Sequence, residues 1–335
     1  MPVKVAINGF GRIGRLTLRS IIELRRTDIE VVAINDLGAA KTLAHLLKYD
    51  SVHGPYLGSI EVGDDWIDVG SGKIWVSSER DPASLPHAKL GVDVALECTG
   101  LFTSKEKARS HLRAGAKRVL VSAPCEGADK TIVYKVNHET LTADDVVVSN
   151  GSCTTNVLAP VAKVLNDLFC IERGYMTTVH AYTGDQPTLD AVHKDLYRAR
   201  AAALSMIPTS TGAANAIALV LPELRGKLHG SSIRVPTPNV SVIDLAVSAS
   251  REVSVGEVNG AFQQAANGPM SGVLAVTVEP LVSIDLTHRT ESAIVALPQT
   301  DVVDGRMVRV LAWYDNEWSF ATRMADITLA MAQLI

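Results

Sequence analysis

The chain has 335 residues, of which 47% are hydrophobic and 20% are charged, a composition typical of folded globular proteins. Its length exceeds what a single small core requires and predicts two domains. The formal net charge of −4 provides no basic surface for nucleic acid or for an anionic membrane, and no apolar stretch is long enough to span a bilayer. We therefore expect a small-molecule partner, with no nucleic acid and no membrane.

The first 150 residues alternate short apolar runs with runs of helical spacing. The predicted strands cover residues 3–7, 30–34, 92–97, 118–121 and 145–148, and the predicted helices cover 12–26 and 105–114. Strands that are joined through helices favour a parallel sheet with right-handed crossovers. This half of the chain is therefore predicted to be an α/β domain.

After residue 150 the pattern changes to one long helix followed by alternating strands. The predicted helices cover residues 154–169 and 320–334, and the predicted strands cover 173–180, 233–235, 240–248 and 307–313. This order is typical of an α+β domain with a mainly antiparallel sheet. Pro160 falls inside the first of these helices, and the sequence pattern does not explain it.

The four cysteines stand at positions 98, 125, 153 and 170, without the paired spacing of zinc ligands. No metal site is therefore predicted. The N-terminal residues lack a basic segment followed by an apolar run, so we expect no leader and a cytoplasmic protein. Thiols stay reduced in that compartment, and each cysteine is then either an inert core residue or a reactive one.

A glycine-rich turn follows the first predicted strand and opens the first predicted helix. Gly9, Gly11 and Gly14 allow a tight turn and a close approach of backbone amides to a pyrophosphate at a helix N-terminus. Asp36 ends the second strand, 22 residues after Gly14, where a carboxylate would bind the adenosine ribose and repel a 2′-phosphate. The pattern predicts a Rossmann-type domain that binds NAD in preference to NADP. The alternative is a simple glycine turn with an unrelated surface carboxylate.

Cys153 lies among small polar residues at the predicted start of the helix over residues 154–169. A helix N-terminus stabilises a thiolate through its dipole and its free amide groups, which favours a nucleophile. Serine and threonine are also ordinary helix caps, so a structural thiol in a capping turn explains the same residues equally well. These residues alone do not decide between a nucleophile and a structural thiol.

His180 ends the predicted strand over residues 173–180 and begins a polar segment. A histidine at a strand end near a reactive cysteine can serve as its general base. The chain has nine histidines, and most histidines are structural or lie at the surface. The spacing therefore leaves a base and a structural histidine equally open.

Six blocks, in the same order along the chain, together resemble the glyceraldehyde-3-phosphate dehydrogenase family. They are NGFGRIGR at 8–15, SCTTN at 152–156, HAYT at 180–183, TSTGAA at 209–214, RVPTPN at 234–239 and WYDNEW at 313–318. The resemblance runs nearly end to end. It implies an NAD-binding domain over residues 1–152, a catalytic domain over 153–318, and a closing helix, about 319–335, that packs back onto the first domain.

The resemblance implies a reversible, phosphorylating oxidation of D-glyceraldehyde 3-phosphate to 1,3-bisphosphoglycerate with NAD, as in glycolysis and gluconeogenesis. Cys153 would attack the aldehyde carbon and carry the thioester intermediate, and His180 would take the proton and activate the thiol. Inorganic phosphate would then cleave the thioester. Members of the family are usually homotetramers, so the same assembly is expected.

The resemblance also assigns the binding residues position by position. Besides the glycines and Asp36, the cofactor contacts would be Arg12, Ile13, Arg80, Ser122 and Asn316. The substrate's own phosphate would be bound by Thr183 and Arg234. The attacking phosphate would be bound by Ser152, Thr154, Arg198, Thr211 and Gly212. Hydroxyls, amides and guanidinium groups are suitable ligands for tetrahedral oxyanions.

Some positions depart from the usual family pattern. Val157 stands where a second cysteine is common, which excludes a local disulfide with Cys153, and Gly151 replaces a common alanine. Cys125 and Glu126 replace the usual alanine and lysine, so a secondary oxidation site at Cys125 is one hypothesis.

The pair Ala191-Val192 is small where NAD-specific members often carry Leu-Pro, which is associated with acceptance of NADP. Asp36 and Leu37 favour NAD. One alternative function is an erythrose-4-phosphate dehydrogenase, but that subfamily alters the residues after the base histidine and the Thr-Gly block, both of which are retained here. The other is a non-catalytic NAD-binding regulator, which would be expected to lose Cys153, His180 or an anion ligand.

Overall fold

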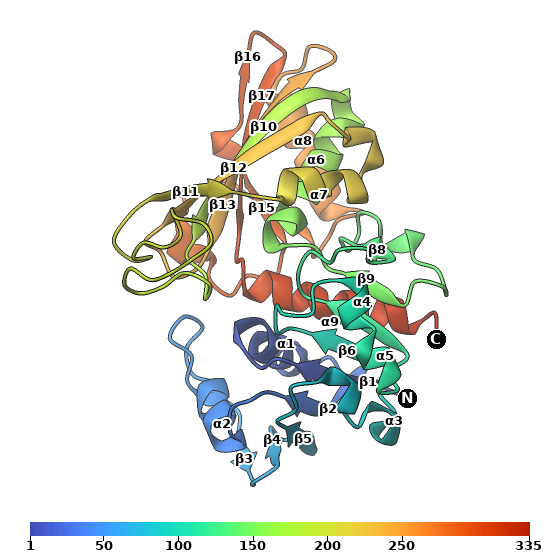
Figure 1. Ribbon diagram of the computed structural model, residues 1–335. Coiled ribbons are helices and arrows are strands. Elements are labelled where there is room, and N and C mark those ends of the chain that lie inside the picture. Colours follow the sequence, from blue (N-terminus) through green and yellow to red (C-terminus); the bar gives the residue numbers. More distant parts are fainter. The chain divides into compact units, whose positions relative to one another are not determined.

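The computed structural model describes all residues from 1 to 335 and divides the chain into two compact units. The first unit comprises residues 1–132, 138–151 and 321–335, and the second comprises 133–137 and 152–320. Figure 1 shows the elements of each unit. The predicted domain limits, 1–152 and 153–318, remain predictions about which segments fold independently.

The first unit is built on a nine-stranded sheet with the strand order β3-β4-β5-β2-β1-β6-β7-β9-β8. Its strands are β1 (Val3–Asn8), β2 (Ile29–Asn35), β3 (Glu61–Val62), β4 (Trp66–Asp68), β5 (Lys73–Ser77), β6 (Val94–Glu97), β7 (Arg118–Val121), β8 (Lys130–Thr131) and β9 (Val147–Ser149). Its helices are α1 (Arg12–Glu23), α2 (Ala40–Lys48), α3 (His87–Leu90), α4 (Lys105–Ala108) and α5 (Ser110–Arg113), with 3-10 turns η1 (Pro82–Ser84) and η2 (His138–Thr140). The strands from β5 to β8 are parallel, and the β3–β4 and β4–β5 pairs are antiparallel.

Strand β1 lies at the centre of this sheet and is apolar because it is buried on both faces. Val5, Ala6 and Ile7 are almost fully buried, as expected for a parallel strand covered by helices. Its neighbours are β2 on one side and β6 on the other. The strand order therefore reverses at β1, and ligands of such sheets bind outside the carboxyl ends of the strands at this point. The predicted Rossmann-type architecture is confirmed.

The second unit contains an eight-stranded sheet with the path β11-β12-β10-β13-β17-β15-β14, and β16 pairs with β17. Its strands are β10 (Ile171–Ala181), β11 (Ile207–Ser210), β12 (Leu228–Val235), β13 (Ser241–Ala249), β14 (Leu274–Thr277), β15 (Ala293–Ala296), β16 (Asp301–Val303) and β17 (Met307–Tyr314). Its helices are α6 (Cys153–Phe169), α7 (Ala213–Val220) and α8 (Val255–Asn267), with 3-10 turns η3 (Pro222–Leu224), η4 (Ser283–Leu286) and η5 (Leu297–Gln299). Only the β10–β12 and β14–β15 pairs are parallel, so the predicted mainly antiparallel sheet is confirmed.

Helix α6 anchors the core of the second unit. Val157, Val161 and Leu165 are fully buried at helical spacing, in one apolar cluster with side chains of β10, β13 and β17. The helix continues through the buried Pro160, which has no N–H to donate to the carbonyl of Asn156. Packing on both sides of that turn therefore outweighs the lost hydrogen bond.

The last helix, α9 (Trp318–Ala332), ends within the first unit. Arg118 donates from Nη2 to the carbonyl of Leu334 at 2.7 Å, and Arg26 pairs with Asp326 at 2.7 Å. These contacts attach residues after Ala321 to the parallel sheet and to the end of α1.

Two sequence predictions need correction. The helix expected over 105–114 is two short helices that meet at Arg109, and the strand expected over 233–235 is only the end of the longer β12. No helix of the chain is long and apolar enough to cross a membrane. All four cysteines are free thiols.

Candidate active site

The glycine turn between β1 and α1 is shaped by contacts that leave no room for side chains. A Cβ on Gly14 would lie 2.1 Å from the carbonyl oxygen of Gly9, and a Cβ on Gly9 would lie 2.7 Å from the amide nitrogen of Thr99. Gly9 also has a φ of 89°, which favours glycine. At Gly11, in contrast, a Cβ would meet nothing within 4 Å. Gly11 is the N-cap of α1, and no side chain caps that helix.

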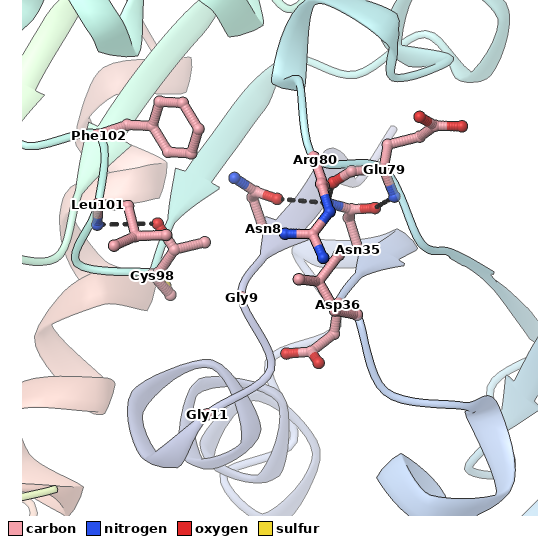
Figure 2. A pocket seen from close by; sticks show the side chains of 12 residues that line it. Asn8, Gly9, Gly11, Asn35, Asp36, Glu79, Arg80, Cys98, Leu101 and Phe102 are labelled. Carbon is pink, nitrogen blue, oxygen red and sulfur yellow. Dashed lines mark hydrogen bonds between the residues drawn. The ribbon is translucent and has the colours of Figure 1, made fainter.

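A cavity of about 350 Å³ opens beside this turn at the carboxyl ends of β1, β2 and β6. Figure 2 shows its lining residues. They are Asn8, Gly9, Gly11, Asn35, Asp36, Leu37, Glu79, Arg80, Cys98, Thr99, Leu101 and Phe102. Four of the predicted cofactor residues, namely Gly9, Gly11, Asp36 and Arg80, therefore lie in one cavity.

Asp36 is held at the cavity by the backbone of two neighbouring segments. Its Oδ2 accepts from the amide of Phe10 at 2.8 Å, and its Oδ1 accepts from the amide of Gly38 at 2.9 Å. The carboxylate is thus fixed relative to the glycine turn before any ligand binds. This preorganisation suits a hydrogen bond to ribose hydroxyls.

The remaining cofactor residues predicted in the first unit do not line this cavity. Arg12 forms an ion pair with Asp50, and Ile13 is half-buried in the first turn of α1. Ser122 follows β7, where its amide donates to the carbonyl of Glu97 at 2.9 Å. Like Gly14, these three residues are not among those that line the cavity around Asp36.

A buried polar network beneath the cavity was not predicted from the sequence. Glu97 is 1% exposed, and it accepts from Asn8 Nδ2 at 2.6 Å and from the amide of Thr99 at 2.8 Å. His111 lies 3.0 Å from the same carboxylate, and Asn35 donates to Asn8 at 2.7 Å. These contacts orient the side chains of Asn8 and Asn35 in the cavity wall. Asn8, Asn35 and Glu97 each end one of three adjacent parallel strands, and this shared position is the sequence signal that could have revealed the network.

In the second unit, Cys153 is the first residue of α6. Ser152 caps this helix by accepting from the amide of Thr155 at 3.0 Å. The cap leaves the half-buried Cys153 side chain at the positive end of a 17-residue helix. Of the predicted phosphate ligands in this turn, Ser152 therefore also serves as the helix cap.

Cys153 and His180 form a hydrogen-bonded pair. Cys153 Sγ lies 3.4 Å from His180 Nε2, and His180 Nδ1 lies 2.6 Å from the carbonyl oxygen of Ala181. A carbonyl only accepts, so Nδ1 carries the proton and Nε2 presents its lone pair to the thiol. Arg234 Nη1 also lies near Nδ1, but it donates to the Ala181 carbonyl and to Thr183 Oγ1, at 3.0 and 2.9 Å. The structure thus unites both predicted catalytic residues.

The electrostatics favour a neutral pair. Burial, assisted by the charge of Arg234, lowers the pKa of His180 to about 3. Burial also raises the pKa of the Cys153 thiol, although Arg234 and a hydrogen bond from Thr154 act in the opposite direction. The proton therefore rests on sulfur, and Nε2 is free to accept it when the sulfur attacks.

Arg234 reaches the same site because of the strand register. Strands β10 and β12 run parallel with His180 opposite Arg234, so their side chains meet at one edge of the sheet. Thr183, two residues after β10 ends, accepts from Arg234. The Nε of Arg234 is buried without a hydrogen-bond partner, a donor that an anion can use. The predicted ligands of the substrate's phosphate therefore lie together.

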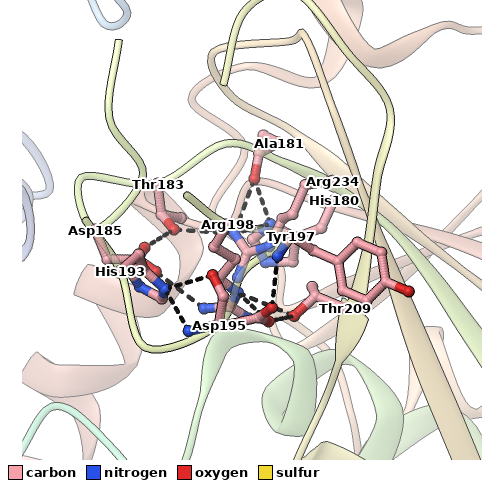
Figure 3. A network of polar contacts seen from close by, with 10 residues as sticks. All are labelled: His180, Ala181, Thr183, Asp185, His193, Asp195, Tyr197, Arg198, Thr209 and Arg234. Atoms are coloured by element: carbon pink, nitrogen blue, oxygen red, sulfur yellow. Dashed lines mark hydrogen bonds and ion pairs between the residues drawn. The ribbon is translucent and has the colours of Figure 1, made fainter. Parts of the chain in front are cut away.

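Arg198 approaches this group from the long connection between β10 and β11. Its Nη1 donates to Asp185 Oδ2 at 2.9 Å, and its Nε donates to Thr209 Oγ1 at 3.1 Å. Thr209 in turn donates to Asp195 at 2.6 Å. Figure 3 shows this network around Arg198 beside His180 and Arg234. Asp185 and Thr209 were not predicted as site residues, although Thr209 begins the TSTGAA block and Asp185 follows the HAYT block closely.

The other predicted residues of the second unit take separate positions. Thr211 accepts from the amide of Ala213 at 3.2 Å, and Gly212 is the N-cap of α7. Asn316 is buried and accepts from Ser241 Oγ at 2.8 Å. No hydrogen bond or ion pair joins Thr211 or Gly212 to Arg198.

Tyr314 supports the catalytic pair and was not predicted as a site residue. This fully buried side chain hydrogen-bonds to Thr154 at 3.0 Å and to Thr178 at 2.9 Å. Its ring meets the His180 ring edge to face, with centroids 5.9 Å apart. Burial raises the pKa of Tyr314, so its hydroxyl stays protonated. It therefore links the first turn of α6 to the strand that carries the base.

Cys98 and Cys125 are poor nucleophiles at neutral pH. Burial and the charge of Glu97 raise the pKa of Cys98 to about 12, and burial with Asp129 raises that of Cys125 to about 11. Neither has a cationic partner that would stabilise a thiolate. These surroundings speak against the hypothesis of a readily oxidised Cys125.

Comparison with known proteins agrees with this arrangement. A family model described as the NAD binding domain of glyceraldehyde 3-phosphate dehydrogenase matches residues 3–105, and the model of its C-terminal domain matches residues 152–316. Proteins named glyceraldehyde-3-phosphate dehydrogenase from Cereibacter sphaeroides and Xanthobacter flavus are each 66% identical to the chain, with full coverage of both sequences. A protein of the same name from Zymomonas mobilis is 55% identical, also with full coverage. The chain belongs to the glyceraldehyde-3-phosphate dehydrogenase family.

Proposed function

We propose that the chain oxidises D-glyceraldehyde 3-phosphate to 1,3-bisphosphoglycerate, with NAD and inorganic phosphate, through a thioester on Cys153. The observation that carries the proposal is the thiol at the N-terminus of α6 with a neutral imidazole nitrogen 3.4 Å away. The names of the relatives support the substrate. The reaction is reversible, so it can serve glycolysis or gluconeogenesis.

NAD fits the first unit. The turn around Gly11 leaves open space at the uncapped N-terminus of α1, where the amides of the first helical turn favour a pyrophosphate. Asp36 is held at the cavity wall, suited to the adenosine ribose and unfavourable to a 2′-phosphate. When bound, the nicotinamide ring accepts the hydride of the oxidation. Arg80 would complete the cavity wall around the adenosine half.

The chemistry of the second unit begins with the catalytic pair. Cys153 Sγ bonds to the aldehyde carbon as its proton passes to His180 Nε2, which delivers the proton to the aldehyde oxygen. When the hydride leaves this carbon, Nε2 takes the same proton back and the carbonyl of the thioester forms. A phosphate oxygen then attacks the thioester carbon, the C–S bond breaks, and its electron pair returns to sulfur.

Two anions take part, and the proposal assigns them separate ligands. Thr183 and Arg234 bind the phosphate of the substrate, supported by the buried donor on Arg234. Ser152, Thr154, Arg198, Thr211 and Gly212 bind the attacking phosphate. Charge-assisted hydrogen bonds from guanidinium groups supply much of the affinity at such sites.

The test is NADH formation from glyceraldehyde 3-phosphate, with and without inorganic phosphate, for wild type and Cys153→Ser. We expect steady turnover only when phosphate is present, and a loss of kcat of several orders of magnitude in the variant. Steady turnover without phosphate would refute the acyl-phosphate mechanism. Residual activity of Cys153→Ser near that of wild type would refute the nucleophile.

We also propose a cytoplasmic homotetramer without nucleic-acid or membrane partners. Five apolar side chains in the connection between β10 and β11 are each more than 70% exposed, namely Leu189, Val192, Leu196, Leu204 and Met206. Several large apolar side chains exposed in one segment are typical of subunit interfaces. Light scattering after size exclusion should give four times the chain mass, and Leu196→Glu should lower it. A wild-type monomer would contradict the assembly.

A further inference from the structure

An acidic side chain lies among the groups assigned to the two phosphates. Asp185 belongs to the connection between β10 and β11, and its side chain is 45% exposed. Its Oδ1 accepts from the hydroxyl of Thr183, and its Oδ2 accepts from Arg198 Nη1 at 2.9 Å. Figure 3 shows the carboxylate between these two donors. One carboxylate thus takes a donor from each assigned phosphate site.

The Thr183 hydroxyl has no spare proton. Its single proton is donated to Asp185, and its oxygen already accepts from Arg234. At Arg198, Nε is engaged by Thr209 and Nη1 by Asp185, but the guanidinium has further N–H groups. A phosphate that binds through the Thr183 hydroxyl must therefore replace the carboxylate as the acceptor, whereas a phosphate at Arg198 meets the carboxylate as a neighbouring negative charge.

Asp185 is negatively charged while it holds these donors. Burial alone would raise its pKa, but the hydrogen bond from Thr183 and the charges of Arg234 and Arg198 outweigh burial and lower it. A phosphate arriving at the same donors meets a like charge at close range, and such repulsion weakens binding even in a largely hydrated site. The carboxylate therefore opposes phosphate in two ways, by competition and by repulsion.

We propose that Asp185 is an internal anion that occupies the phosphate donors of the empty site and lowers the affinity for phosphate. It keeps Thr183 and Arg198 oriented until a phosphate displaces it. The role of Asp185 rests on the proposed function for the identity of the phosphates. The competition itself requires only a phosphate anion, either free or carried by the substrate.

The variant Asp185→Asn tests the proposal because it removes the charge and keeps an oxygen that can accept from Thr183. The matched control is Asp190→Asn, which removes the same charge from an exposed pair with Arg200 in the same connection, at 3.0 Å. The readouts are the KM for inorganic phosphate, the KM for glyceraldehyde 3-phosphate, and the KM for glyceraldehyde, which lacks a phosphate. Binding of inorganic phosphate by calorimetry, with NAD present, provides a readout independent of turnover.

We expect Asp185→Asn to lower the KM or Kd for phosphate about threefold to tenfold, the range of a screened charge at short distance. Asp190→Asn and the KM for glyceraldehyde should show no such gain. A gain for inorganic phosphate alone locates the repulsion at Arg198, and a gain for glyceraldehyde 3-phosphate alone locates the competition at Thr183. Unchanged or weaker phosphate binding in Asp185→Asn would overturn the proposal, because a carboxylate that only orders the loop predicts a loss. A wild type that binds phosphate but does not turn over would refute the proposed function and leave the binding test intact.

Discussion

Alanine substitutions at Gly14 and Gly11 should separate folding from cofactor binding in the glycine turn. At Gly14 the new Cβ would lie 2.1 Å from the carbonyl oxygen of Gly9 and 3.1 Å from Ile7 Cγ2. The turn cannot move away easily, because Gly9 is itself packed against the backbone of Thr99. Such overpacking costs roughly 3 kcal/mol of unfolding free energy.

At Gly11 the new methyl group meets nothing within 4 Å, and the φ of −70° suits alanine. We expect Gly11→Ala to keep its stability within about 0.5 kcal/mol of wild type. The methyl group would project into space proposed for the pyrophosphate, so the Kd for NAD should rise at least about tenfold, or 1.4 kcal/mol.

Thermal or denaturant unfolding without cofactor measures the first effect, and calorimetric titration with NAD measures the second. The expected pattern is a destabilised Gly14→Ala and a stable Gly11→Ala with weak NAD binding. Normal NAD affinity in Gly11→Ala would refute the assigned position of the pyrophosphate. Normal stability in Gly14→Ala would refute the packing argument.

Three further outcomes follow from side chains around the two sites. Tyr314→Phe leaves two buried threonine hydroxyls without their shared partner, so the unfolding free energy should fall by about 1–3 kcal/mol. The kcat should also fall while the Kd for NAD is unchanged. Denaturant unfolding and steady-state kinetics measure these effects, and an unaltered kcat would contradict the prediction. Burial, with a smaller effect of the neighbouring histidine, lowers the pKa of His87 to about 4. As the pH falls, this histidine is therefore protonated in the unfolded chain before it is protonated in the folded chain. Between about pH 6.5 and pH 4, wild type should lose about 3 kcal/mol more unfolding free energy than His87→Gln. If the unfolding free energies of wild type and His87→Gln fell equally over this pH range, the lowered pKa of His87 would be contradicted. Iodoacetamide with peptide mapping should label Cys153 well before Cys125, whose pKa is about 11, and equal labelling rates would overturn the view of a single reactive thiol.

Much of the first unit could be predicted because its signals are local. The period of apolar residues reveals strands and helices, and glycines report directly on backbone conformation. Asp36 was found from its distance along the chain to the glycine turn, and the structure holds it beside that turn. The helix over 105–114 was wrong in detail because a break at Arg109 leaves the helical pattern of apolar residues intact.

The catalytic arrangement was less accessible from residues alone because it depends on strand register. His180 and Arg234 meet only because β10 and β12 pair in parallel across 54 positions of sequence. Tyr314 arrives from β17, and no spacing rule links it to Thr154. Asp185 was missed because an acidic residue in an exposed loop is ordinary, and only its contacts with Thr183 and Arg198 distinguish it.

The most direct test of the central claim is to trap the thioester on the chain itself. The enzyme is mixed with glyceraldehyde 3-phosphate and NAD without inorganic phosphate, quenched in acid, digested and analysed by mass spectrometry. We predict a burst of about one NADH per chain and a phosphoglyceroyl adduct on the peptide that contains Cys153. When phosphate is added, NADH formation should become continuous and the adduct should no longer accumulate. Continuous NADH formation with an unmodified Cys153, or an adduct on another residue, would contradict the account.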